Sequence, residues 1–333
     1  MKQTISFCVV IAVVLASTFT FAYSPRLAHK PLTLLALSVY NKCNSNEVTY
    51  KDFERREHVV LGNIAMDEGK RALPGLHKYS FANGSLAMIK RTVNWHFYNP
   101  FRERLSIQGW VDKSQTRLWK RAKEEFNKYE KNDKREFSLG GILHLVEDAS
   151  VPAHVVPVYH GPVLPDFYGK FEHLVDYMKD HVENGLIKDK IDLIEPDTIA
   201  LSVLIQADIG SFCKLTQTEL TADAIRRSLA YKTLTMVESE IPGCDGFSWY
   251  DFWIAPEGQR YFGKYNIENG NPLFGNAGTL TKNKAGSILY CKFEKDDLRY
   301  KGFVTKLHTE AIKADLQILG WASKRLELNG SNR

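Results

Sequence analysis

Residues 139–154 read Leu-Gly-Gly-Ile-Leu-His144-Leu-Val-Glu-Asp148-Ala-Ser-Val-Pro152-Ala-His154. Residues four apart share a face of an α-helix, so this stretch predicts a helix that presents His144 and Asp148 side by side. Pro152 then ends the helix, and His154 just past the break can turn back toward the same cavity. A His-x-x-x-Asp spacing alone more often marks a surface pair or a helix-stabilising contact. The proline break and the second histidine favour a metal site, because imidazole nitrogen and carboxylate oxygen both suit Zn²⁺.

Helical patterns extend on both sides of this stretch. Apolar residues recur at helical spacing among charged ones, and neither a train of alternating short strands nor an internal repeat is present. The predicted helices occupy residues 31–40, 52–73, 114–130, 135–150, 167–185, 194–210, 217–239 and 303–328. The sequence therefore predicts an all-α fold, a multi-helix bundle.

Residues 241–300 break the helical pattern. They are rich in aromatic side chains and in Gly, Asn and Pro, a composition typical of turns and short strands. We expect an irregular insertion folded over the helical body near the C-terminus. It is interpreted either as a packed irregular loop or as an aromatic lid or lipid-contacting flap.

Composition places the chain among globular proteins. Of its 333 residues, 44% are hydrophobic and 25% are charged, which excludes disordered, collagen-like and low-complexity classes. The formal net charge of +5 is compatible with an anionic substrate. No clustered run of Lys and Arg stands out, so the charge does not by itself predict nucleic-acid binding.

The N-terminus has the pattern of an export signal. Lys2 precedes an almost wholly apolar run from Ile5 to Ala16, and small residues follow at the expected cleavage site. Residues 1–22 are predicted to be a signal peptide and residues 23–333 the mature domain, secreted or periplasmic. A retained membrane anchor is the competing interpretation, since the apolar run is near the lower length limit for spanning.

Export makes the cysteines structural candidates. Four cysteines remain in the mature chain, and an oxidising compartment favours two disulfides with three possible connectivities. They are Cys43, Cys213, Cys244 and Cys291. We prefer the pair Cys244 with Cys291, because these two residues bracket the predicted insertion.

Further segments carry a resemblance to a known family. Residues 139–176, which include the helix around Glu172, resemble the His-x-x-x-Asp-x-x-x-Pro-x-His and His-x-x-x-Glu signature of the zinc-dependent phospholipase C family, whose relatives include the fungal single-strand zinc nucleases. Three upstream residues match the family's ligand positions: His29 near the mature terminus, Asp67 in Gly62-Asn-Ile-Ala-Met-Asp67, and His96 in Asn94-Trp-His96-Phe-Tyr-Asn-Pro100. Taken singly, each has another interpretation: a helix-start residue, a solvated face and a core histidine, respectively.

The resemblance implies two or three Zn²⁺ ions. One ion would use Asp67, His96, His144 and Asp148. A second would use the mature terminus, expected at Tyr23, with His29 and a bridging Asp148. A third would use His154, Glu172 and a histidine whose place Tyr168 takes in this chain. Phenol binds Zn²⁺ poorly unless it is ionised, and its reference pKa is about 10. The third site is therefore expected to be weak, absent, or completed by His160 or Asp166.

The resemblance also implies an activity. The chain would be a phospholipase C-like phosphoric diester hydrolase that cleaves glycerophospholipids by metal-activated water, with Asp67 as the catalytic residue acting on the water. Its partners would be phospholipid and a transient membrane surface, and it would act as a monomer. The alternatives are a zinc nuclease or other phosphodiesterase, for which nucleic acid would be the partner, and a non-catalytic metal-stabilised binding protein, which Tyr168 favours.

Overall fold

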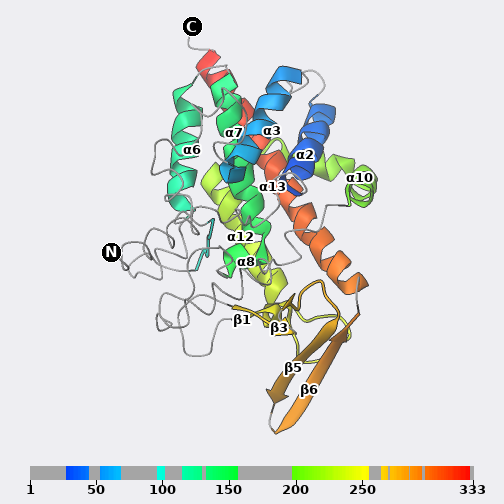
Figure 1. Cartoon of the computed structure of the whole chain (residues 1–333). Helices are drawn as coiled ribbons and strands as arrows, with labels where there is room; N and C mark the ends of the chain where they lie inside the picture. The colour runs from blue at the N-terminus through cyan, green and yellow to red at the C-terminus, as the bar shows by residue number, and fades with distance from the viewer. Residues whose placement is uncertain are drawn as a thin grey trace, which may run out of the picture.

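A computed structural model gives the fold of most of the chain. It describes residues 28–44, 53–68, 96–101, 115–129, 133–156, 197–254, 264–268, 271–284, 286–294 and 297–330. These residues are mostly helical, with a small β-hairpin near the C-terminus (Figure 1). The predicted helical body is confirmed. The predicted all-α class is corrected, because the described residues also contain a small β-hairpin. The predicted signal peptide and the predicted helix at 167–185 lie outside the described residues.

Helix α7 (Asp133–Glu147) runs through the middle of the body. Every residue from Arg135 to Glu147 is buried, as expected for a helix covered on all sides. Its helical neighbours are α3 (Phe53–Glu68), α6 (Thr116–Lys128), α12 (Ala222–Glu238) and α13 (Leu298–Gly330). Helix α2 (Lys30–Cys43) contacts the end of α7 through the side chain of Thr33. Helix α13 begins at Leu298, whereas the sequence predicted its start at residue 303. It therefore includes the last residues of the predicted insertion.

Two glycines allow α3 and α7 to pack backbone against backbone. A Cβ added at Gly62 of α3 would lie 1.8 Å from the carbonyl oxygen of Phe137. A Cβ added at Gly140 of α7 would lie 1.9 Å from the carbonyl oxygen of Val59. Real Cβ atoms do not approach oxygen so closely, so both positions require glycine for this contact. The close packing fixes α3 against the helix that carries His144.

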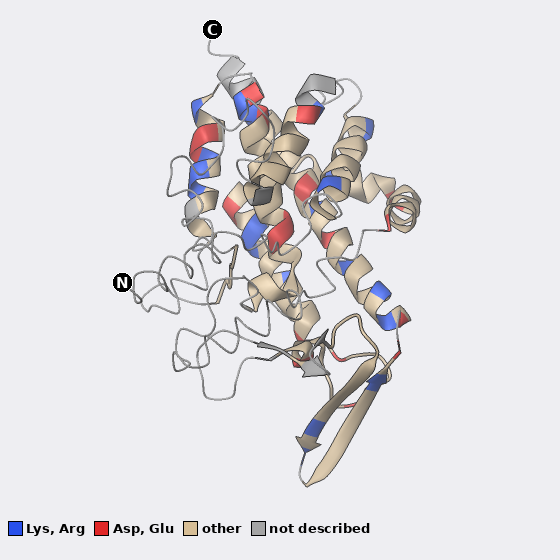
Figure 2. Cartoon of the chain, viewed as in Figure 1, with Lys and Arg blue, Asp and Glu red and all other residues tan. Residues whose placement is uncertain are grey.

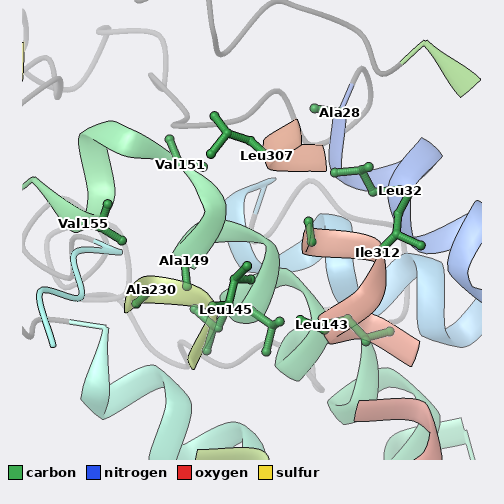
Figure 3. Close-up of a cluster of buried hydrophobic side chains, with 14 of the residues drawn as sticks. Ala28, Leu32, Leu143, Leu145, Ala149, Val151, Val155, Ala230, Leu307 and Ile312 are labelled. Carbon is green, nitrogen blue, oxygen red and sulfur yellow. The ribbon is translucent and has the colours of Figure 1, made fainter. Parts of the chain in front are cut away.

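The hydrophobic core lies where the helices meet around the C-terminal half of α7 (Figure 3). Buried side chains from α2, α7, α12 and α13 contribute to it, together with those that follow α7. The labelled members are Ala28, Leu32, Leu143, Leu145, Ala149, Val151, Val155, Ala230, Leu307 and Ile312. His144, Asp148 and His154 are therefore carried by segments whose neighbouring side chains form this core.

Helices α10 (Thr198–Ala207) and α11 (Ile209–Leu215) replace the single helix predicted at 194–210. The break falls at Asp208, and the two axes differ by 92°. Among the described residues, no single helix is long and apolar enough to cross a membrane, and this bent pair meets the criteria by length and composition only. Charged residues are spread over α6, whereas α10 carries none (Figure 2).

The segment between α12 and α13 contains short strands, as its composition predicted. The 3-10 helix η6 (Trp249–Phe252) leads into β1 (Trp253–Ile254), β2 (Lys264–Tyr265), β3 (Ile267–Glu268), β4 (Asn271–Pro272), β5 (Gly278–Lys284) and β6 (Ser287–Phe293). The strands pair antiparallel as β1 with β2, β3 with β4, and β5 with β6. The β5–β6 turn contains Gly286 at φ 82°, a left-handed conformation that favours glycine.

Five aromatic residues of this segment form a packed cluster, whereas Tyr290 of β6 is exposed; the five are Trp249, Phe252, Trp253, Phe274 and Phe293. The ring of Trp249 stacks on that of Phe303 of α13, with ring centroids 4.2 Å apart. Phe274 packs against Tyr300, and the Tyr300 hydroxyl donates a hydrogen bond to the carbonyl of Leu273 at 3.2 Å. Burial of these rings against α13 agrees with a packed segment and leaves them unavailable as an exposed lid.

Both disulfides join elements that are distant in the sequence. Cys244 pairs with Cys291 and ties β6 to the loop after α12, which confirms the preferred pair. Cys43 pairs with Cys213 and ties the end of α2 to α11. Two disulfides indicate an oxidising compartment.

Candidate metal centre

The end of α7 sets the geometry of the centre. The α-helix ends at Glu147, and Asp148–Ser150 continue as a 3-10 turn, η4. Pro152 then begins the short helix α8 (Pro152–Val155). This break directs His154 back toward the preceding turn, where its Nδ1 lies 3.3 Å from Oδ1 of Asp148. The expected return of the histidine after the proline is confirmed.

Four imidazoles surround the carboxylate of Asp148. On one side, Oδ2 lies 2.7 Å from Nδ1 of His96 and 3.3 Å from Nε2 of His144. On the other side, Oδ1 faces Nδ1 of His154, and it lies 3.5 Å from Nε2 of His29. Asp148 and three of the rings are buried, and His96 is the most exposed member. Each carboxylate oxygen thus has two imidazole neighbours.

His29 reaches the centre from the N-terminal end of α2. Pro31 occupies the first turn of this helix, where its fixed φ and missing N–H are tolerated. The helix packs on α3 and α13, and its start lies against the end of α7. The rings of His29 and His144 stack with centroids 3.9 Å apart. Ligand atoms of His29, His144 and Asp148 all lie within 4.8 Å of one another, so these three residues could hold one metal ion.

The segment 96–101 brings His96 to the centre without being helical. The Tyr98 N–H donates to the carbonyl of His154 at 3.0 Å, and the Phe97 carbonyl accepts from the Gln115 N–H at 3.1 Å. The ring edge of Phe97 also meets the ring of His154. These contacts join the two histidine-bearing segments directly, so the positions of His96 and His154 are coupled.

A buried arginine fixes the same segment from α12. The guanidinium of Arg226 lies over the rings of Tyr98 and Trp119, 4.0 Å and 4.2 Å from their centroids. Its Nη1 donates to Oε1 of Gln115 at 3.0 Å, and the Gln115 amide donates to the carbonyl of Leu145 at 2.8 Å. Arg226 therefore links segment 96–101 to α6 and to the last turn of α7.

The imidazoles determine the charge state of Asp148. Burial raises the pKa of its carboxyl, but the surrounding imidazoles, with His144 the strongest, outweigh burial and hold that pKa well below its usual range. Burial lowers the pKa of the His29 ring, and so does His144. Hydrogen bonds to the neighbouring carboxylates outweigh both and raise the pKa of His29 above its usual value. The centre thus presents an ionised, buried carboxylate.

A second layer of polar residues lies behind His29, and the sequence reasoning missed it. Nδ1 of His29 lies 2.5 Å from Oε2 of Glu147, whose other oxygen accepts a hydrogen bond from Thr33 at 2.7 Å. Asn63 of α3 donates to Glu147 Oε2 at 3.0 Å. Burial and the charge of Glu147 raise the pKa of Asp315 well above its usual value, which favours the protonated form of Asp315.

His308 extends this layer along α13. Burial and the nearby His29 lower the pKa of His308 to about 3, so its ring is neutral near pH 7. His308 and Asp315 are seven residues apart and share the buried face of α13 with Ala311 and Leu319. His308 and Asp315 interrupt an otherwise apolar face of the helix. This pattern in the sequence could have indicated a buried polar site.

The structure places the sequence-predicted ligands as follows. His29, His96, His144, Asp148 and His154 converge on one point. Asp67 lies in α3, and its side chain is outside the described part of the structure. Tyr23, Glu172, Tyr168, His160 and Asp166 also lie outside the described residues, so the N-terminal ligand and the third predicted site stay predictions.

Comparison of the chain with known protein families, with curated proteins and with solved structures found no match. The chemistry of the centre therefore has to be argued from its own residues. Among the described residues, every ion pair of Glu147 and Asp148 is with an imidazole. Such a donor set of nitrogen and oxygen atoms is suited to bind a divalent cation of the Zn²⁺ type.

Proposed function

We propose that this protein is a secreted or periplasmic zinc-dependent phosphoric diester hydrolase of the phospholipase C type. The observation that carries the proposal is the carboxylate of Asp148 with four imidazoles around it. The order of the matching segments along the chain supports the same assignment, since it resembles the zinc-dependent phospholipase C family. The two disulfides support the extracytoplasmic location.

The donor set fits the proposed metal. The carboxylate of Asp148 is already ionised and needs no deprotonation to bind Zn²⁺, and imidazole binds Zn²⁺ in its neutral form. His29, His144 and Asp148 would hold one ion. His96 and His154 contact the same carboxylate and would extend the donor set to a second ion. A cation there would also offset the buried negative charge.

The proposed chemistry is hydrolysis of a phosphodiester. When bound, Zn²⁺ lowers the pKa of water from about 15.7 to about 7 and neutralises charge on phosphate oxygens. The chain's own residues hold the geometry: Asp148 is fixed by the helix break, and His96 by the hydrogen bonds of its segment. By resemblance, Asp67 would orient or deprotonate the attacking water. The net charge of +5 favours an anionic substrate.

Metal analysis combined with two substrates tests the proposal. Mature protein purified without chelator should contain two or three zinc ions per chain by mass spectrometry. It should release diacylglycerol from phosphatidylcholine vesicles, and EDTA should abolish this activity and lower Tm together. Restoration by added Zn²⁺ controls for irreversible damage by the chelator.

Other results would select an alternative. Hydrolysis of single-stranded DNA without vesicle hydrolysis would replace the phospholipase assignment with a zinc nuclease. Bound zinc without either activity would favour a metal-stabilised binding protein. Protein that contains no zinc and whose Tm is unchanged by EDTA would contradict the proposal altogether.

A further inference from the structure

His29 is held between two consecutive carboxylates at the end of α7. Its Nδ1 lies 2.5 Å from Oε2 of Glu147, and its Nε2 lies 3.5 Å from Oδ1 of Asp148. Side chains of successive residues in a helix project about 100° apart, so two consecutive residues do not normally contact the same side chain. They do so here because the imidazole ring of His29 lies between the two carboxylates, with one nitrogen facing each. The ring of His29 therefore has a different carboxylate at each nitrogen.

Glu147 is itself fixed by contacts from three other helices. Thr33 of α2 donates to Oε1, and Asn63 of α3 donates both to Oε2 and to the Thr33 hydroxyl, the latter at 2.8 Å. Asp315 of α13 is also close enough to interact with the Glu147 carboxylate. All of these side chains are completely buried. A carboxylate with so many fixed donors keeps a single orientation.

Thr33 helps to hold His29 in a fixed position relative to Glu147. Thr33 follows His29 by four residues, so both side chains project from the same face of α2. Both bond to Glu147, one at each oxygen. A rotation or a shift of α2 against α7 would break the two bonds together. The pair therefore fixes the position of the α2 N-terminus relative to Asp148.

We propose that Glu147 is a positioning residue of the centre: it accepts the Nδ1 proton of His29 and thereby leaves Nε2 as the nitrogen that binds the metal beside Asp148. This inference rests on the proposed metal-dependent function. Histidine ligands commonly donate their second N–H to a carboxylate, which fixes the tautomer and makes the imidazole a stronger ligand. Loss of such a partner lowers metal affinity by about 10–100-fold.

The wild-type tautomer gives the first test. In metal-free full-length mature protein with ¹⁵N-labelled histidine, NMR at a pH where the His29 ring is neutral should show its single proton on Nδ1. A proton on Nε2 instead would overturn the proposal. This readout needs no variant and no bound metal. A wild type that binds no zinc would therefore overturn the proposed function, whereas the spectrum still reports the Glu147–His29 contact separately.

Zinc affinity, measured by competition with a chelator, gives the second test. Glu147→Leu removes the acceptor at similar size and should weaken zinc binding by about 10–100-fold. Glu147→Gln keeps a carbonyl acceptor and should restore part of the affinity and the Nδ1 tautomer. Such rescue would not follow from a role in packing alone.

A matched control comes from the same helix. Glu136 is also buried in α7, but it lies eleven residues from Glu147, about 16 Å along the axis. Glu136→Gln should leave zinc affinity and the His29 tautomer unchanged. Equal loss of affinity in Glu136→Gln and Glu147→Leu would overturn the proposal, as would wild-type affinity in Glu147→Leu. If Glu147→Leu does not fold, the Glu147→Gln variant and the wild-type tautomer still decide the question.

Discussion

Nδ1 of His96 lies 2.7 Å from Oδ2 of Asp148, although the two residues come from different segments of the chain. His96 belongs to a non-helical segment, and Asp148 lies just past the end of α7. The contact depends on the hydrogen bonds that join the 96–101 segment to His154 and Gln115. Asp148 is thus the point at which all the described ligand candidates meet.

Asp148→Asn should be the most damaging single substitution for metal binding. It keeps the size of the side chain but removes the charge that four imidazoles surround. Zinc affinity should fall by more than the about 10–100-fold that is typical of residues that only hold a ligand in place. Zinc content after dialysis, with activity on vesicles, measures the effect.

Asp133→Asn is the control for this substitution, because Asp133 lies at the start of the same helix with an exposed side chain. It should retain zinc and activity. An Asp148→Asn protein that keeps its zinc after dialysis would remove Asp148 from the ligand set.

Asp315→Asn should make the stability of the metal-free protein less dependent on pH as the pH rises above 3.8. A raised pKa means that the folded protein holds the Asp315 proton more tightly than the unfolded chain, whose reference value is 3.8. This stabilisation is complete below pH 3.8 and is lost as the pH rises through the raised pKa. The loss reaches up to about 1.4 kcal/mol per pH unit for one proton.

Urea unfolding in EDTA at several pH values measures this effect. The free energy of unfolding of the wild type should fall more steeply above pH 5 than that of Asp315→Asn, since asparagine has no proton to lose in this range. Asp245→Asn, at an exposed turn position, should follow the wild-type curve. Parallel curves for the wild type and Asp315→Asn would mean that Asp315 is already ionised.

Removal of either disulfide should destabilise the protein, and the longer loop should matter more. The Cys43–Cys213 bond spans 170 residues and the Cys244–Cys291 bond spans 47. Loop-closure entropy predicts losses of about 5 and about 4 kcal/mol, respectively. Paired Cys→Ser variants, unfolded in guanidinium chloride, test this order. A larger loss for Cys244 and Cys291 would show that native packing around β6 outweighs chain entropy.

Gly140→Ala should disrupt the contact between α3 and α7. The added Cβ would lie 1.9 Å from the Val59 carbonyl oxygen, so the helices must separate, at a cost of about 3 kcal/mol. Gly302→Ala is the matched control in α13, where nothing lies within 4 Å of the added Cβ. It should stabilise the protein by about 0.5–1 kcal/mol. Thermal unfolding of both variants compares the two effects, and equal Tm values would contradict the close contact.

The sequence predicted local relationships well. The spacing of His144 and Asp148 placed them on one helix face, and Pro152 marked the break that returns His154. The composition of residues 241–300 indicated short strands. The break at Asp208 was missed, because the apolar run continues through it and helical periodicity carries no sign of the turn.

What the sequence alone determined about this protein is a set of helices and one pair of ligands at helical spacing, because those depend on residues within a few turns of one another. The tertiary structure decided the rest of the centre. His29 meets Glu147 across 118 residues, and only the packing of α2, α3 and α13 against α7 brings Thr33, Asn63 and Asp315 around that carboxylate. Periodicity shows that a side chain is buried, but the identity of its partner depends on how whole helices pack.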